Sequence, residues 1–133
     1  MRTVYLAHPL SDRTPEGVAR NRFNAAHWGI WIAKVFPCSV SADWIWWSMV
    51  LDESSENRVL GLERDCVQIG KCDELWMTGG RCSSGMAIES AHAKKTGVVV
   101  RDLTGFGYLP PQSWPTATRE LTSFVELVFR EWS

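Results

Sequence analysis

The chain has 133 residues, a net charge of −1 and a pI near 6.3, and 45% of its residues are hydrophobic. A single domain of this size can bury a core without a metal or disulfide staple, and the near-neutral charge argues against a protein that binds nucleic acid electrostatically. No apolar run approaches membrane-spanning length and no charged-then-apolar segment opens the chain, so we expect a soluble, cytoplasmic protein that does not bind membranes.

The cysteines and histidines show no metal-ligand spacing. No two cysteines form a C-x-x-C pair, and the histidines add no recognisable ligand set; the positions are Cys38, Cys66, Cys72, Cys82, His8, His27 and His92. We therefore expect neither a metal nor another cofactor. Reduced, mostly buried thiols are the simpler interpretation.

The chain opens with a short apolar strand and a polar loop. Residues 2–7 predict the strand and residues 8–13 the loop, after which Thr14 can cap a helix. A stripe at 3.6-residue spacing predicts the buried face of this helix, formed by Ala19, Phe23, Ala26, Ile30 and Ala33. Trp28 and Trp31 lie off the stripe, so we expect them to contact something besides the home sheet.

The middle of the chain is less regular. Residues 34–40 predict a second strand, although Pro37 weakens its centre. Residues 41–57 predict a long loop, and loops of this length in a compact domain are usually functional. The next helix should run to about residue 72, with a buried stripe formed by Val59, Leu62, Cys66 and Ile69. Asp65 borders this stripe and could point towards the strand ends.

The clearest unit is a buried strand, a turn, a helix and a second buried strand. Two short apolar runs, 75–77 and 98–100, are the strands, because runs this short with one helix between them fit a parallel sheet covered on both faces. Gly79-Gly80 marks the turn, and Ser83 or Ser84 can cap the helix.

The remaining chain completes the predicted fold. A last helix from about residue 116 has an apolar face, formed by Leu121, Phe124, Val125 and Val128. Tyr108 marks a possible short fifth strand in a passage rich in glycine and proline. The alternation of strands and helices predicts a single α/β domain over residues 1–133. Its doubly wound, flavodoxin- or Rossmann-like parallel sheet should have four or five strands in the order 2-1-3-4(-5), with helices on both faces.

Candidate chemistry lies at the start of the helix that follows residue 83. Ligands of open parallel sheets bind where strands end and helices begin, and the unpaired N–H groups there favour an anion. The Ser83-Ser84-Gly85 turn is therefore a candidate phosphate cradle. Glu89 lies little more than one turn further along, where the positive helix end should keep its carboxylate ionised and suited to act as a nucleophile.

These residues resemble a known family, the nucleoside 2-deoxyribosyltransferase-like proteins, which include the deoxynucleoside-monophosphate N-glycosidases. The resemblance rests on a spaced pattern: Asp65, seven residues, Asp73, nine residues, Ser83, then Gly85 and Glu89. The opening Val4-Tyr5-Leu6-Ala7, followed by Pro9, is similar to the first strand and substrate loop of that family. The resemblance covers most of the first hundred residues.

The resemblance implies an N-glycosidic chemistry with named roles. Glu89 would be the nucleophile that attacks the anomeric carbon, and Asp65 would orient or protonate the leaving base. Tyr5 would belong to the substrate site, whereas Asp73 opens a strand and fits a structural role. The family's transferases for free nucleosides tend to carry an acid where this chain has Ser83, which favours a 5′-phosphorylated substrate.

Several residues admit two interpretations. His8 departs from the small residue that the family commonly has in this loop, and it either lines the pocket or hydrogen-bonds locally. Ser11 and Arg13 could reach a phosphate, although Arg13 is equally an ordinary exposed residue. The cluster of Trp44, Trp46 and Trp47 could stack on a base or form a dimer contact.

Two functional hypotheses follow. The first is an enzyme, an N-glycosidase or 2-deoxyribosyltransferase acting on a nucleoside or nucleotide. The second is a non-catalytic protein that senses or sequesters a nucleotide in the same pocket. The off-stripe and clustered tryptophans predict a homodimer or a dimer of dimers. The resemblance implies that such an assembly shares its active site, with residues 108–114 as the segment that could reach a neighbouring pocket.

Overall fold

The structure is a computed structural model that describes residues 1–51, 54–111 and 118–133. Its elements in chain order are β1 (Arg2–Ala7), α1 (Pro15–Val35), β2 (Cys38–Ser41), α2 (Trp44–Val50), α3 (Ser55–Gly70), β3 (Glu74–Met77), α4 (Ser84–Lys95), β4 (Val99–Asp102), a 3₁₀ helix η1 (Thr104–Phe106) and α5 (Arg119–Trp132). No described helix is long and apolar enough to cross a membrane. The described residues also contain no group of histidine, cysteine or acidic side chains that could hold a metal ion.

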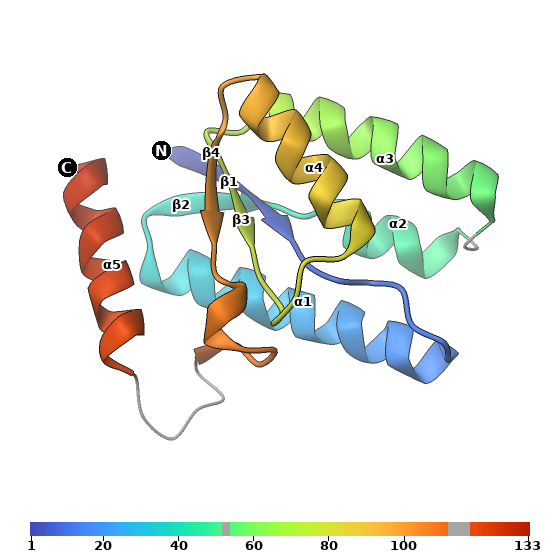
Figure 1. The fold of residues 1–133 in the computed structure, drawn as a ribbon, viewed down its shortest axis with the longest axis horizontal. Coiled ribbons are helices and arrows are strands. Elements are labelled where there is room, and N and C mark those ends of the chain that lie inside the picture. Colours follow the sequence, from blue (N-terminus) through green and yellow to red (C-terminus); the bar gives the residue numbers. More distant parts are fainter. Residues whose placement is uncertain (52–53, 112–117) are drawn as a thin grey trace.

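The strands form one parallel sheet in the order β2-β1-β3-β4, with β1 at its centre beside β3 (Figure 1). The prediction of a doubly wound α/β fold in the order 2-1-3-4 is confirmed. The possible fifth strand at Tyr108 is wrong, since that residue lies in a bend after η1 and the sheet has four strands in the described part of the chain.

Alternation along the strands divides the core into two layers. Val4 and Leu6 pack with α1 and α5, whereas Tyr5 and Ala7, on the opposite face of β1, pack with α3 and α4. Successive side chains of a strand point to opposite faces, so both faces of β1 carry buried residues. Because of this alternation, the side chain of Tyr5 lies in the layer between the sheet and helices α3 and α4, where the candidate active site is found.

The predicted buried stripe of α1 is wrong. Phe23 and Ile30 are 68% and 49% exposed, while Trp28 and Trp31, expected to contact something else, are 0% and 8% exposed in the core below the sheet. Large aromatic side chains bury more apolar area than the alanines of the competing stripe, so they determine which face of α1 turns inward.

The middle of the chain is more regular than predicted. Helix α1 continues to Val35, so the second strand begins only after Pro37, and the expected loop contains α2. Helix α3 buries Ile69 of its predicted stripe, whereas Val59 is 57% exposed. The apolar face of α5 is confirmed, because Leu121 and Val128 are buried.

A buried ion pair ties α5 to the sheet. Glu74 on β3 is 2% exposed, and its carboxylate accepts hydrogen bonds from Arg101 on β4, from Trp76 and from Trp132 at the end of α5. Burial alone would raise the pKa of Glu74, but these hydrogen bonds lower it below its usual value. Arg101 also donates to Glu131, so one cation joins both acids.

Removing this carboxylate should cost much of the stability of the fold. Glu74→Ala leaves the Arg101 guanidinium, only 10% exposed, without its buried partner. Breaking a buried pair in this way costs about 3 to 5 kcal/mol, and we expect that loss in the free energy of unfolding measured in urea. Glu126→Ala, at an exposed position of α5, is the control and should change stability little. Equal losses in the two variants would contradict this account.

Candidate active site

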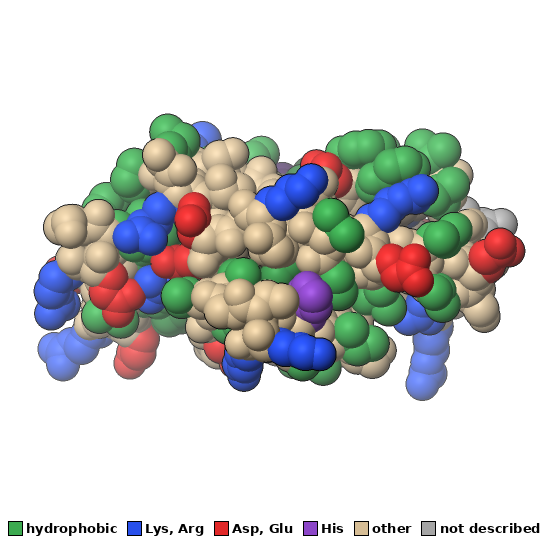
Figure 2. All heavy atoms as spheres, turned by 90° about the horizontal axis from the view of Figure 1, so that it is seen from above, with side chains coloured by type: hydrophobic (Ala, Val, Ile, Leu, Met, Phe, Trp, Pro, Cys, Tyr) green, Lys and Arg blue, Asp and Glu red, His purple; other side chains and the backbone are tan. Residues whose placement is uncertain are grey.

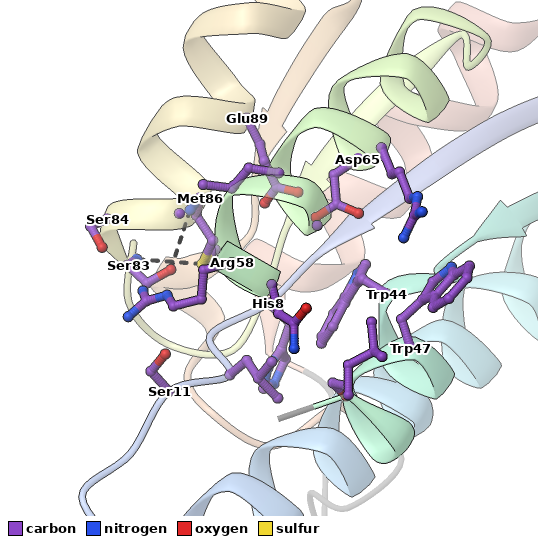
Figure 3. A pocket seen from close by; sticks show the side chains of 18 of the residues that line it. His8, Ser11, Trp44, Trp47, Arg58, Asp65, Ser83, Ser84, Met86 and Glu89 are labelled. Atoms are coloured by element: carbon purple, nitrogen blue, oxygen red, sulfur yellow. Dashed lines mark hydrogen bonds between the residues drawn. The ribbon is translucent and has the colours of Figure 1, made fainter. Parts of the chain in front are cut away.

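A pocket of about 280 Å³ opens beside the carboxyl ends of β1 and β3. Its walls come from the loop after β1, from α2 and α3, and from the turn and first residues of α4 (Figure 3). Seven of the nine predicted site residues line it: His8, Ser11, Asp65, Ser83, Ser84, Gly85 and Glu89. Tyr5 lies directly behind Glu89, whereas Arg13 is exposed and does not line the pocket.

Two buried side chains and one half-buried side chain form the chemical centre of the pocket. The Tyr5 hydroxyl donates a hydrogen bond of 2.6 Å to Oε2 of Glu89, and Tyr5 and Glu89 are 1% and 7% exposed. The Asp65 carboxyl lies within hydrogen-bonding reach of both Glu89 and Tyr5. Packing of α3 against α4 brings the two acids together above β1, as the sequence pattern suggested.

Burial raises the pKa of both acids. The pKa of Glu89 is raised to about 8, mainly because burial disfavours its charged form, and the negative charge of Asp65 raises it further. Burial also raises the pKa of Asp65, to about 6. Near neutral pH the pair therefore holds one proton between two carboxyl groups. Tyr5 stays a neutral donor, because burial and the nearby charge of Glu89 raise the pKa of its hydroxyl.

This result corrects the expected ionisation of Glu89. The helix dipole acts within the first turn, but Glu89 is the sixth residue of α4, so loss of hydration outweighs any dipole effect. Glu89 faces the pocket, as its place in the sequence predicts. Its protonation depends on contacts with Tyr5 of β1 and Asp65 of α3, and the sequence around Glu89 does not indicate these contacts.

The start of α4 has the predicted cap. Ser83 accepts a hydrogen bond of 3.2 Å from the Met86 N–H, and its carbonyl accepts the Ala87 N–H. A helix start leaves four N–H groups without an intrahelical backbone acceptor. Here the Ser83 N–H donates to Sδ of Met86 and the Met86 N–H to Ser83, and the other two belong to Ser84 and Gly85, which line the pocket. An added Cβ at Gly85 would meet no atom within 4 Å, so the space beside this turn is open.

The pocket is also lined by three arginines that the sequence pattern did not indicate. They are Arg58 and Arg64 from α3 and Arg81 from the turn before α4. Arg81 also donates a weak hydrogen bond of 3.5 Å to the Ser11 carbonyl. Arg81 could have been suspected, because it follows the Gly79-Gly80 turn at a strand end. Arg58 and Arg64 could not, since exposed charges on a helix carry no periodic signal.

His8 both lines the pocket and hydrogen-bonds locally, so the two interpretations of this residue hold together. It donates from Nδ1 to the Pro9 carbonyl at 2.6 Å, while its Nε2 accepts from the Asn24 amide at 2.9 Å. Burial lowers the pKa of His8 to about 4, so the ring is neutral. The same amide donates to the Tyr108 carbonyl, which links the pocket wall to the segment after η1.

The tryptophan cluster divides into two parts. Trp44 is anchored by a hydrogen bond of 2.9 Å from its Nε1 to the Leu6 carbonyl, and with Trp47 it lines the pocket. Trp46 lies outside this pocket and stacks on Trp47, with ring centroids 4.8 Å apart. Tyr108 is the first residue of the segment 108–114, expected to reach a neighbouring pocket, and its hydroxyl donates a hydrogen bond to Asn21 on α1 of its own chain. Residues 112–114 of this segment lie outside the described residues.

A family model described as a domain of unknown function, DUF7768, matches residues 2–103. The chain belongs to the DUF7768 family. The matched region runs from β1 through β4 and contains every residue of the pocket, whereas α5 lies beyond it. Comparisons with curated proteins and with solved structures gave no match. The functional interpretation of this DUF7768 protein therefore rests on the residues of the pocket.

The buried Glu89 carboxyl should make the fold less stable at high pH. Its pKa rises from 4.5 in an ordinary carboxyl to about 8 in the folded protein, so stability present below pH 4.5 is lost as the pH rises through 8. Glu89→Gln removes this titration. Between about pH 5 and about pH 8.5, the variant should lose less unfolding free energy than the wild type, by a few kcal/mol.

Urea unfolding at the two pH values, followed by tryptophan fluorescence, measures this difference. Glu126→Gln alters an exposed carboxyl of α5 and should keep the wild-type pH dependence. If Glu89→Gln also keeps it, the Glu89 carboxyl is not protonated by burial.

Proposed function

We propose that this DUF7768 protein cleaves or exchanges the N-glycosidic bond of a nucleoside 5′-monophosphate through a covalent intermediate on Glu89. The observation that carries the proposal is the group of Tyr5, Glu89 and Asp65: the two acids line the same pocket as the start of α4, and Tyr5 hydrogen-bonds to Glu89 from behind. The resemblance to nucleoside 2-deoxyribosyltransferase-like proteins agrees with it, because four of the five residues of that pattern, Asp65, Ser83, Gly85 and Glu89, line this pocket. The fifth, Asp73, lies outside it and accepts a hydrogen bond from the Thr3 N–H.

The arrangement of side chains along the pocket favours one orientation of the substrate. Arg58, Ser83 and Ser84 lie on one side of the pocket, and Trp44 and Trp47 lie on the other (Figure 3). A phosphate fits the first side, where N–H groups and guanidinium groups favour an anion. A base fits the aromatic side. The sugar would then lie between them, beside the two acids.

The single proton of the acid pair suits this reaction. When it rests on Asp65, Glu89 is a carboxylate, and its free oxygen can attack C1′ while the C1′–N bond breaks. The electron pair of that bond goes to the base nitrogen, which takes the proton from Asp65. Water or a second base then attacks C1′, returns a proton to Asp65 and releases the Glu89 carboxylate.

Tyr5 positions the nucleophile. Its hydroxyl donates to Oε2 of Glu89, which fixes the carboxyl orientation and leaves Oε1 for the sugar. The hydrogen bond also favours the ionised form of Glu89 against the effect of burial.

One observation favours the non-catalytic alternative. A pKa of about 8 leaves Glu89 largely protonated in the free protein at neutral pH, and a protonated carboxyl is not a nucleophile. A protein that only senses or sequesters a nucleotide would have no need of the ionised form. Chromatography separates the two functions, because only the enzyme releases free base from a bound nucleotide on long incubation.

Loss of Glu89 should abolish base release. Glu89→Ala and Glu89→Gln remove the attacking oxygen, so we expect kcat to fall by several powers of ten while nucleotide affinity and the fold remain. Chromatography of the free base measures turnover, and calorimetry measures binding. Near wild-type turnover in Glu89→Ala would exclude a covalent intermediate on this residue.

The phosphate side should make the enzyme prefer a nucleotide. The kcat/KM for a nucleoside 5′-monophosphate should exceed that for the free nucleoside, and Arg58→Met should reduce this preference by about tenfold or more, since charge-assisted hydrogen bonds are lost. Arg13→Met is the matched control, because Arg13 lies outside the pocket. Equal kcat/KM values for nucleoside and nucleotide would instead place the protein among transferases of free nucleosides.

We also propose assembly into a homodimer or a dimer of dimers. Trp28 and Trp31 are buried in the core, so these two rings cannot contribute to the expected interface. Other apolar side chains are exposed at the neighbouring ends of α2 and α3: Met49 (65%), Val50 (81%) and Val59 (57%). Figure 2 shows hydrophobic side chains gathered towards that end of the molecule. Exposed apolar patches of this kind mark interfaces.

Light scattering at micromolar concentration tests the assembly. The wild type should exceed the 15.0 kDa of one chain, and Val50→Asp should shift it towards the monomer. Ile88→Asp, at an exposed apolar position of α4, should leave the mass unchanged. A wild-type monomer would remove both the interface and any shared site.

A further inference from the structure

A second pocket of about 430 Å³ adjoins the active-site pocket. The two pockets have Trp47, Arg64 and Asp65 in common, so these three side chains lie where the pockets meet. Asp65, which would donate the proton to a departing base, therefore faces both spaces. The proposed reaction uses only the first pocket and gives the second no role.

The second pocket has an aromatic wall. The rings of Trp46 and Trp47 stack at 25° with centroids 4.8 Å apart, and the Arg64 guanidinium carbon lies 4.7 Å from the Trp47 centroid. Trp46 is 52% exposed although it packs in this group. A large flat ring left open to solvent beside a pocket offers a surface on which a planar ligand can stack.

The two pockets differ in the charge of their lining residues and should therefore bind different ligands. The active-site pocket has three arginines and two acids, whereas the second pocket has Arg64 against Asp43, Glu63 and Asp65. An excess of carboxylates disfavours a phosphate and favours a neutral or cationic ring. Gln68, which also lines the second pocket, offers an amide donor and acceptor of the kind that pairs with the edge of a heterocycle.

We propose that the second pocket binds a free nucleobase, stacked on Trp46 and hydrogen-bonded to Gln68. The place of this site in a reaction rests on the proposed function: a base leaves or approaches the glycosyl-enzyme past Asp65 while the sugar phosphate stays in the first pocket. A separate base site serves exchange of one base for another, because the incoming base can be held before it reacts. The binding itself requires no turnover.

The indole N–H signals of the ¹⁵N-labelled protein provide the test. Trp46→Phe and Trp47→Phe assign the two signals. Titration with free adenine or free cytosine at millimolar concentration should shift both. Ribose 5-phosphate should leave the Trp46 signal unchanged, because Trp46 does not line the pocket proposed for phosphate and sugar.

Variants test the contacts. Trp46→Ala should weaken base binding roughly tenfold, since stacking supplies much of the affinity for a base. Gln68→Ala, on the surface of α3, should weaken it as well and provides a second readout if Trp46→Ala does not fold. Val67→Glu should block the pocket, whereas Ile88→Glu, at a similarly exposed apolar residue of α4 outside both pockets, should not.

The outcomes separate this inference from the proposed function. Base-induced shifts of the Trp46 signal without any base release from nucleotides would support the second pocket and reject the enzyme. Base release without such shifts at millimolar base would overturn the second pocket and leave the enzyme standing. Shifts of the Trp46 signal by ribose 5-phosphate, or equal effects of Val67→Glu and Ile88→Glu, would also overturn it.

Discussion

The site depends on one constraint: a carboxyl group has been taken out of water between β1, α3 and α4. Glu89 has lost nearly all of its hydration, and Tyr5 and Asp65 are the groups that compensate. A buried charge without partners would be prohibitively costly, so the group keeps a proton and shares it. Tyr5 can serve because the alternation of β1 points its ring into this layer, and Asp65 because α3 packs on α4.

The features that could be predicted from the sequence are those that local chemistry encodes. Short apolar runs mark the central strands, and Thr14 and Ser83 mark helix starts because their side chains accept N–H groups three residues on. The spacing of Asp65 and Glu89 matches the pattern of a family that resembles this chain, and that resemblance predicts that they share one pocket. Each of these signals lies within a few residues or within one strand–helix–strand unit and the helix before it.

The features that escaped prediction depend on distant parts of the chain. Two faces of α1 were plausible, and the choice between them depends on the rings of Trp28 and Trp31 meeting α5 and the sheet. Arg58 looks like any solvated helix residue until α4 is placed opposite it. The protonation of Glu89 depends on burial beside Asp65 and Tyr5, which lie 24 and 84 residues away along the chain, so no local rule could supply it.

The ion pair between Glu74 and Arg101 has a consequence for how the domain can change in evolution. Both residues lie within the region that matches the DUF7768 family, but Trp132 and Glu131, which complete their hydrogen bonds, lie outside it on α5. The last helix is therefore not a removable addition. A descendant that lost it would expose a charged pair suited to burial, and Glu74 would come under selection to become a residue that needs no partner from the end of the chain.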